Sequence, residues 1–364
     1  MVLRFVKFSL YAFAVAGLLS TCSTEKGGNL PPASGVSGDM YIIMDSAQWK
    51  GELGAVLDSV LSQELQALPR PEPIFKIWWV NPKKLNPVLK QRRNLIFAVT
   101  FDQRSEGASL LKAMYTDKAV AEMEKDSSLF IRTVPDVYAK RQQVMYLFGM
   151  KETELVAKIR KNGTRIIEFF NKTERERLTV TLFAGNPNKG YQDVLRKSLG
   201  CDMKIPFGYR LVMNNSEFFW VRQINPKDDR NVLVYRTPYT SPKQFERDSL
   251  IQLRNRMLQK YVYEDPERLD TYLVTETSVP YKPVLTRTVT HNERFATEMQ
   301  GLWRSNNLGM GGPFISIAMV APDSPYLYYV EGFVYGPGRD LRELIREVET
   351  VLYTLQFPKP AAAQ

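Results

Sequence analysis

The chain has 364 residues, 44% of them hydrophobic and 24% charged, and its formal net charge is +10. These values are typical of a globular protein with one large domain or two smaller ones. Basic and acidic residues are interspersed, as between residues 151 and 177, and no nucleic-acid-binding motif accompanies them, so no nucleic-acid partner is expected.

The first residues have the pattern of a bacterial lipoprotein signal peptide. Two basic residues precede an apolar run over residues 8–19, which is well short of the roughly 20 residues that a membrane-spanning helix needs. Cys22 follows that run in a sequence that resembles a lipobox, although Thr21 stands where Gly, Ala or Ser is usual. We predict a signal peptide over residues 1–21 and lipid attachment at Cys22. The alternative is an ordinary secretory signal cleaved near residues 14–16.

Residues 22–37 are rich in Gly, Ser and Pro, a composition that does not bury enough apolar surface to fold. We predict a flexible tether here, which keeps the folded part close to its membrane. The chain has two cysteines, and with Cys22 assigned to the lipid, Cys201 has no partner for an intramolecular disulfide. We expect Cys201 to be a small buried side chain.

A first α+β lobe is predicted over residues 38–190 from the spacing of apolar residues and from the turn residues between them. Asp45 is expected to cap the first helix, with Gln48 three residues later as in a capping box. A second helix is predicted around residues 110–125, and a third over residues 151–171, with an interruption near Gly163. The predicted strands are 40–44, 74–80, 94–101 and 143–148. A loop-like stretch over residues 184–189 places the lobe boundary between residues 190 and 200.

A second α+β lobe is predicted over residues 200–357. Ser241 is expected to cap a helix that runs to about residue 261, and Asp340 a last helix that Pro358 stops. The predicted strands are 209–213, 217–224, 231–236, 284–290, 298–304, 314–320 and 326–335. Because many strands are neighbours along the chain, we predict an α+β fold of two lobes, with mostly antiparallel sheets flanked by amphipathic helices.

Motifs for catalysis are missing. His291 is the only histidine, which excludes zinc sites that need two or more histidine ligands, and its place at the end of a strand predicts a surface residue. Neighbouring carboxylates such as Asp228 and Asp229 are interpreted as turn residues rather than as an acid–base pair. There is no nucleophile elbow, phosphate loop or dinucleotide fingerprint. We therefore predict no catalytic residue, no metal site and no cofactor.

The most unusual segment covers residues 301–314, where glycines permit backbone geometry that is closed to other residues. Its aromatic residues either cover the core at a tight connection between strands or form a stacking and hydrogen-bonding platform. If the chain has a ligand or partner surface, we place it at Trp303, Arg304, Gly311, Gly312, Phe314 and Glu331.

Several segments together resemble a family of uncharacterised lipoproteins from Bacteroidetes, known only as a domain of unknown function. They are DSAQWKGEL at 45–53, PRPEP at 69–73, RRNL at 92–95, LVYRTPY at 233–239, residues 301–314, and VEGFVY at 330–335. The resemblance implies a cell-envelope lipoprotein and brings no activity, cofactor or catalytic residue. Surface-exported lipoproteins of that group tend to have several acidic residues after the cysteine. Here Glu25 is the only one, which favours a periplasm-facing position.

The leading hypothesis is a non-enzymatic binding or assembly module, held to the membrane through Cys22, with an envelope protein or a glycan as its partner. We expect it at the outer membrane, facing the periplasm. The alternative is an envelope hydrolase with an unrecognised site near Trp303, Arg304 or Glu331.

Overall fold

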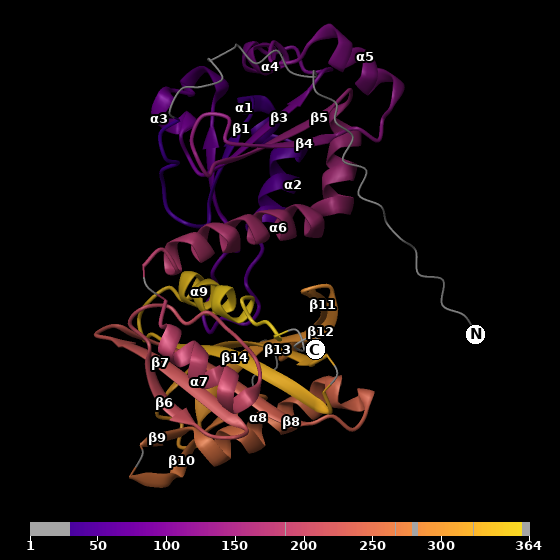
Figure 1. Ribbon diagram of the computed structural model, residues 1–364. Helices are drawn as coiled ribbons and strands as arrows, with labels where there is room; N and C mark the ends of the chain where they lie inside the picture. The colour runs from indigo at the N-terminus through magenta and orange to yellow at the C-terminus, as the bar shows by residue number, and fades with distance from the viewer. Residues whose placement is uncertain (1–29, 186, 266, 279–282, 323, 359–364) are drawn as a thin grey trace, which may run out of the picture. The chain divides into compact units, whose positions relative to one another are not determined.

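The chain folds as two compact units, which the computed structural model describes over residues 30–185, 187–265, 267–278, 283–322 and 324–358 (Figure 1). Unit 1 takes the chain up to residue 60 together with residues 76–164, and unit 2 takes residues 61–75 and 165–364. The predicted signal peptide and Cys22 lie outside the described residues. Within them, no helix combines the length and the apolar character that crossing a bilayer requires.

Unit 1 contains a five-stranded sheet with the strand order β2-β1-β3-β5-β4. Three of its pairings are parallel (β1 with β2, β1 with β3, β3 with β5), and β4 pairs antiparallel with β5. In chain order the elements are β1 (Asp39–Ile43), α1 (Ser46–Lys50), α2 (Glu52–Leu61), β2 (Lys76–Val80), η1 (Pro82–Lys84), α3 (Pro87–Lys90), β3 (Asn94–Thr100), α4 (Glu106–Lys112), α5 (Asp117–Lys125), β4 (Ile131–Pro135), β5 (Gln143–Gly149) and α6 (Glu152–Leu182), whose second half belongs to unit 2.

Every residue of β3 and β5 is buried, as expected for central strands covered on both faces. On one face, Phe97 and Tyr146 stack with ring centroids 5.4 Å apart. They pack against Leu111 of α4 and Met123 of α5, which closes that side of the sheet.

Helix starts and breaks in unit 1 test the local predictions. The cap is confirmed, because Oδ1 of Asp45 accepts a hydrogen bond from the Ala47 amide at 2.8 Å. The capping box is not formed: Gln48 instead donates from Nε2 to Thr100 Oγ1 at 2.7 Å. The interruption predicted at Gly163 is wrong, since α6 is continuous there. This glycine allows close packing, because a Cβ at Gly163 would lie 3.0 Å from a methyl carbon of Val60.

Unit 2 contains a nine-stranded antiparallel sheet with the order β6-β7-β8-β14-β13-β12-β10-β9, and β11 also pairs with β12. In chain order its elements are α7 (Lys189–Leu199), β6 (Arg210–Asn214), β7 (Phe218–Asn225), β8 (Asp228–Pro238), η2 (Pro242–Phe245), α8 (Arg247–Tyr261), β9 (Tyr263–Asp265), β10 (Arg268–Thr275), β11 (Leu285–His291), β12 (Arg294–Ser305), β13 (Gly311–Val320), β14 (Tyr326–Tyr335) and α9 (Arg342–Leu352).

Both faces of this large sheet are covered, so its central strands contain continuous apolar runs. Phe219 and Val221 of β7 point into a core shared with α7 and α9. Their neighbours Phe218 and Trp220 point into the opposite core, which α8 covers. Cys201 is fully buried in the first core, as predicted, and burial raises the pKa of its thiol to about 12.

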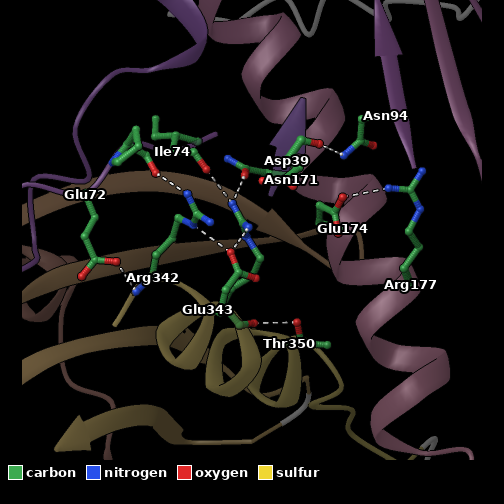
Figure 2. A network of polar contacts seen from close by, with 12 residues as sticks. Asp39, Glu72, Ile74, Asn94, Asn171, Glu174, Arg177, Arg342, Glu343 and Thr350 are labelled. Carbon is green, nitrogen blue, oxygen red and sulfur yellow. Dashed lines mark hydrogen bonds and ion pairs between the residues drawn. The ribbon is translucent and has the colours of Figure 1, made fainter. Parts of the chain in front are cut away.

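The start of α9 shows why residues 61–75 belong to unit 2 (Figure 2). The predicted cap, Asp340, is not used; the residue before the helix is Leu341, which makes no side-chain cap. Instead the carboxylate of Glu72 accepts hydrogen bonds from the amides of Leu341 and Arg342, at 2.8 and 2.9 Å. A carboxylate at this position satisfies free helix N–H groups and complements the helix dipole.

The α+β class is confirmed, and the larger sheet is antiparallel as predicted. The smaller sheet is mixed, because helices α1 and α2 connect β1 to β2, and parallel neighbours require such crossovers. The stretch in which the sequence places the lobe boundary is occupied by α7, whereas the two compact units divide inside α6, between residues 164 and 165.

Candidate functional site

A cleft of about 420 Å³ opens in unit 2 where strands β7 and β14 end and β8 begins. This volume lies within the range of about 300–1,000 Å³ that is usual for small-molecule sites. We call it the strand-end cleft. Its lining residues are Asn225, Pro226, Lys227, Asp228, Asp229, Tyr335, Pro337 and Arg339.

A smaller cavity of about 40 Å³ adjoins this cleft, and Asp229 and Tyr335 line both. A cavity of this volume has room for one or two water molecules but not for a sugar ring or a similar ligand group. Trp303 lines its inner part, with its ring centroid 6.3 Å from that of Tyr335. Trp303, which the sequence singles out, therefore lines the small cavity and not the strand-end cleft itself.

Ion pairs organise the charged groups of the cleft. Asp228, 5% exposed, pairs with Arg339 and also lies 3.3 Å from a guanidinium nitrogen of Arg230. Asp229 pairs with Arg222. Because each carboxylate faces a guanidinium, the cleft offers hydrogen-bond donors and acceptors side by side without a large charge of one sign.

A second buried layer supports this arrangement. Arg230 also reaches Glu347 of α9, with Nε 3.4 Å from the carboxylate. Burial raises the pKa of Glu347, and the nearby Arg230 opposes that rise. The hydroxyl of Tyr209 is buried close to these charges and has no hydrogen-bond partner in the part of the chain that the structure describes; burial raises its pKa as well. Arg230 thus connects the carboxylate of Asp228 in the cleft to Glu347 of α9, which fixes the position of the paired charges.

Trp303 is buried, at 2% exposure, and its indole N–H donates to the Val334 carbonyl at 3.1 Å. Gly312 lies opposite Trp303 in the β12–β13 ladder. A Cβ at Gly312 would lie 2.1 Å from that same carbonyl oxygen. Gly312 is therefore needed because strand β14 approaches β13 closely at this position. The residue with left-handed backbone geometry in the preceding turn is not a glycine but Leu308, with φ of 63°.

The other predicted residues of this segment lie apart from the cleft. Arg304 forms an ion pair with Glu276 at 2.8 Å, and Gly311 is exposed at the start of β13. Phe314 is buried beneath the guanidinium of Arg254, 3.8 Å from the ring centroid. Of the two interpretations of this segment, the one in which its aromatic residues cover the core is therefore the one that the structure has, because Trp303 and Phe314 are both buried.

Glu331 is fully buried, which corrects its predicted place on a ligand surface. It accepts two hydrogen bonds from Arg254, both at 2.8 Å, and a third from the Tyr329 hydroxyl at 2.6 Å. Arg254 also donates to Thr275 Oγ1 at 3.0 Å. All of these hydrogen bonds of Glu331 are made to buried groups, and Arg254 lies on α8. The geometry therefore gives Glu331 a role in packing α8 onto the sheet.

His291, predicted at the surface, is 2% exposed at the end of β11. Its Nε2 lies 2.9 Å from the Leu355 carbonyl oxygen, which requires the tautomer with a proton on Nε2. Nδ1 is buried without a partner, so a second proton there finds no acceptor among the described residues. Burial lowers the pKa of His291, and the hydrogen bond to Leu355 partly opposes this.

Acidification is therefore expected to destabilise unit 2 through His291. The stabilisation that depends on a neutral imidazole is complete above the unfolded-state pKa of about 6.5 and is lost as pH falls toward the lower folded-state pKa. The melting temperature should fall from pH 7.5 to 5.5, and less so in His291→Gln. Burial raises the pKa of Glu347 and of Glu349, and this makes their contribution to stability increase as pH falls. Because the unaltered protein and the His291→Gln variant both contain these two groups, the difference between the two proteins reports on His291. Equal falls in the two proteins would contradict the assignment.

Sequence reasoning did not find the residues that line the strand-end cleft. Asp228 and Asp229 were interpreted as turn residues, and Tyr335 as the end of a strand. The sequence does place Arg222 and Arg230 within a few residues of Asp228 and Asp229, and in the folded hairpin these residues form the ion pairs Arg222–Asp229 and Arg230–Asp228. Among the described residues, no group of three or more His, Cys, Asp or Glu side chains is placed to hold a metal ion.

Two domain families of unknown function match the chain. DUF8532 matches residues 33–183 and DUF4837 matches residues 188–354. They confirm that the chain consists of uncharacterised domains, which is the coarser part of the predicted resemblance. No curated protein matches the chain.

Two solved structures have weak similarity to the chain. One is a crystal structure from Bacteroides thetaiotaomicron VPI-5482, with 11% identity over 44% of this chain and a TM-score of 0.25; the match spans about half of that protein, 46%. The other is the human StarD13 (DLC2) lipid transfer and protein localization domain, with 13% identity, 48% of this chain and 96% of that one covered, and a TM-score of 0.20. At these scores neither structure supports a statement about this chain.

Proposed function

We propose that this protein is a lipid-anchored component of the cell envelope, without enzymatic activity, that binds a saccharide in the strand-end cleft of unit 2. Its anchor is the lipid on Cys22, and it faces the periplasm from the outer membrane. The observation that carries the binding role is the cleft itself, with an aromatic ring set among paired charges.

The chemistry of the cleft suits a neutral, hydroxyl-rich ligand. A sugar hydroxyl both donates and accepts hydrogen bonds, so it can bridge a carboxylate and a guanidinium such as Asp228 and Arg339, which both line the cleft. The half-buried ring of Tyr335 offers a flat apolar face, on which the C–H side of a pyranose packs. Pro226 and Pro337 add apolar walls. Since the cleft's carboxylates are neutralised by guanidinium groups, a strongly charged ligand gains little there.

Replacing Tyr335 by Ala is expected to weaken saccharide binding about tenfold, which corresponds to about 1.4 kcal/mol for the lost stacking and contact area. Binding is measured by titration calorimetry with uncharged oligosaccharides of hexoses and of N-acetylhexosamines. The control is Tyr326→Ala, a half-buried tyrosine at the other end of β14. Binding of none of these saccharides by the unaltered protein, or equal loss in both variants, would contradict the proposal.

Replacing Cys22 by Ala is expected to release the protein from the membrane fraction of cells. The sequence-based lipobox supports this expectation, since three acyl chains give effectively permanent attachment. Membrane fractionation followed by immunoblotting compares this variant with Cys201→Ala, which removes the other cysteine of the chain. A Cys22→Ala protein that stays in the membrane fraction would exclude lipid attachment at this residue.

A further inference from the structure

The first described residues of unit 1, 30–37, are fixed to the rest of the unit by backbone hydrogen bonds. Residues 30–37 were predicted as part of a flexible tether, but they form backbone hydrogen bonds with unit 1. The Ala33 amide donates to the Lys140 carbonyl, and the Ser34 amide to the Gln91 carbonyl, both at 2.9 Å. The Arg93 amide donates to the Ser34 carbonyl at 3.2 Å. The first described residues therefore mark a defined place on unit 1.

A row of stacked side chains extends from this place across the edge of the sheet. The Arg92 guanidinium lies 5.4 Å from the ring centroid of Tyr41, and this ring stacks on Trp78 with centroids 6.3 Å apart. The ammonium of Lys76 lies 4.8 Å from the Trp78 ring centroid. These contacts follow from the parallel register, which places Tyr41 beside Trp78. The row joins the chain entry to the edge strand β2.

Large apolar side chains are exposed along the row and the chain entry, next to basic ones. Trp78 is 41% exposed and Val36 63%. Lys76 and Lys140 are also exposed. We call this the entry surface and define it by Val36, Lys76, Trp78, Arg92 and Lys140. Tryptophan beside lysine and arginine is the composition that favours the interface between lipid headgroups and acyl chains.

The length of chain before this surface limits its distance from an anchor. From Cys22 to Leu30 there are eight residues, which span at most about 29 Å when fully extended. If Cys22 carries lipid, as proposed above, the entry surface cannot be far from the bilayer. Basic side chains within a Debye length of a membrane are attracted by its anionic lipids.

We propose that the entry surface of unit 1 lies against the bilayer, with Trp78 at the level of the lipid headgroups and Lys76, Arg92 and Lys140 facing anionic lipids. This proposal rests on the lipid anchor at Cys22. Contact at this surface gives the anchored protein a preferred orientation, because a lipid on Cys22 alone leaves it free to tilt. This contact is also a second means of membrane attachment, in addition to the acyl chains on Cys22.

The test uses the full-length protein, purified as cells produce it and reconstituted into phosphatidylcholine vesicles with 30% phosphatidylglycerol. Brominated acyl chains quench tryptophan fluorescence at short range. We expect quenching to fall at least twofold in Trp78→Phe and to be unchanged in Trp79→Phe, the neighbour on the opposite face of β2. Lys76→Glu should reduce the increase in quenching that phosphatidylglycerol causes. Lys118→Glu, an equal charge change on α5, should not.

The outcomes separate the two proposals. Protein that floats with the vesicles and shows quenching dependent on Trp78 supports the entry surface. Protein that floats but is quenched equally in Trp78→Phe retains the anchor and overturns the entry surface. Protein that does not float contradicts the anchor, and the entry surface falls with it.

Discussion

Replacing Glu331 by Gln is expected to lower the free energy of unfolding of unit 2 by about 3–5 kcal/mol. The change leaves the guanidinium of Arg254 fully buried without its counter-ion, while both residues keep their volume. It also weakens the acceptor for the Tyr329 hydroxyl, which is buried as well. Urea unfolding followed by circular dichroism measures the loss.

Two comparisons separate this ion pair from general damage. Arg247→Gln alters an exposed ion pair on the same helix, with Asp248, and should cost less than about 1 kcal/mol. The double variant Arg254→Met with Glu331→Leu removes both charges and should recover much of the stability lost in Glu331→Gln. A Glu331→Gln protein within 1 kcal/mol of the unaltered one would show that the pair is not the dominant contact.

Replacing Gly312 by Ala is expected to destabilise unit 2 by about 2–4 kcal/mol. Overpacking in a dense core costs about 1–3 kcal/mol, and the lost hydrogen bond between Trp303 and Val334 adds about 1 kcal/mol. The added methyl group meets a backbone carbonyl of β14 at 2.1 Å, and this strand is paired on both sides and cannot shift easily.

The matched control for this change is Gly190→Ala in α7. A Cβ there finds its nearest neighbour, Asn188 Oδ1, at 3.8 Å, and Ala favours a helix by up to about 1 kcal/mol. That variant should be neutral or slightly more stable. Denaturant unfolding and the change in tryptophan emission relative to the unaltered protein are the measurements. A Gly312→Ala protein as stable as the control would mean that β14 accommodates the methyl group.

Local sequence patterns predicted most elements of the fold because their causes are local. Asp45 caps a helix through a bond to the Ala47 amide, two residues away. The strands around residues 209–236 form the predicted antiparallel hairpins, since their apolar runs are separated by short turns. Helix α7 and strands β4, β9 and β10 were missed, because their apolar residues are few and their patterns short.

The candidate site was only partly predictable. Of the two interpretations of residues 301–314, the structure has the one in which the aromatic residues cover the core, since Trp303 and Phe314 are both buried. Tyr335 becomes part of a cleft through the ends of β7 and β8, more than 100 residues earlier in the chain. No local pattern carries that information, because the lining comes from strands that meet only after the sheet has formed.

The sequence by itself determined the α+β class, the antiparallel character of the larger sheet, the burial of Cys201 and most strands, since each follows from apolar spacing and turn residues within a short window. The tertiary structure decided that Glu72 rather than Asp340 caps α9, that His291 is buried, and that Glu331 binds Arg254. Each of these depends on groups more than 60 residues apart, whose free energy of desolvation is offset only by partners that the folded chain brings together.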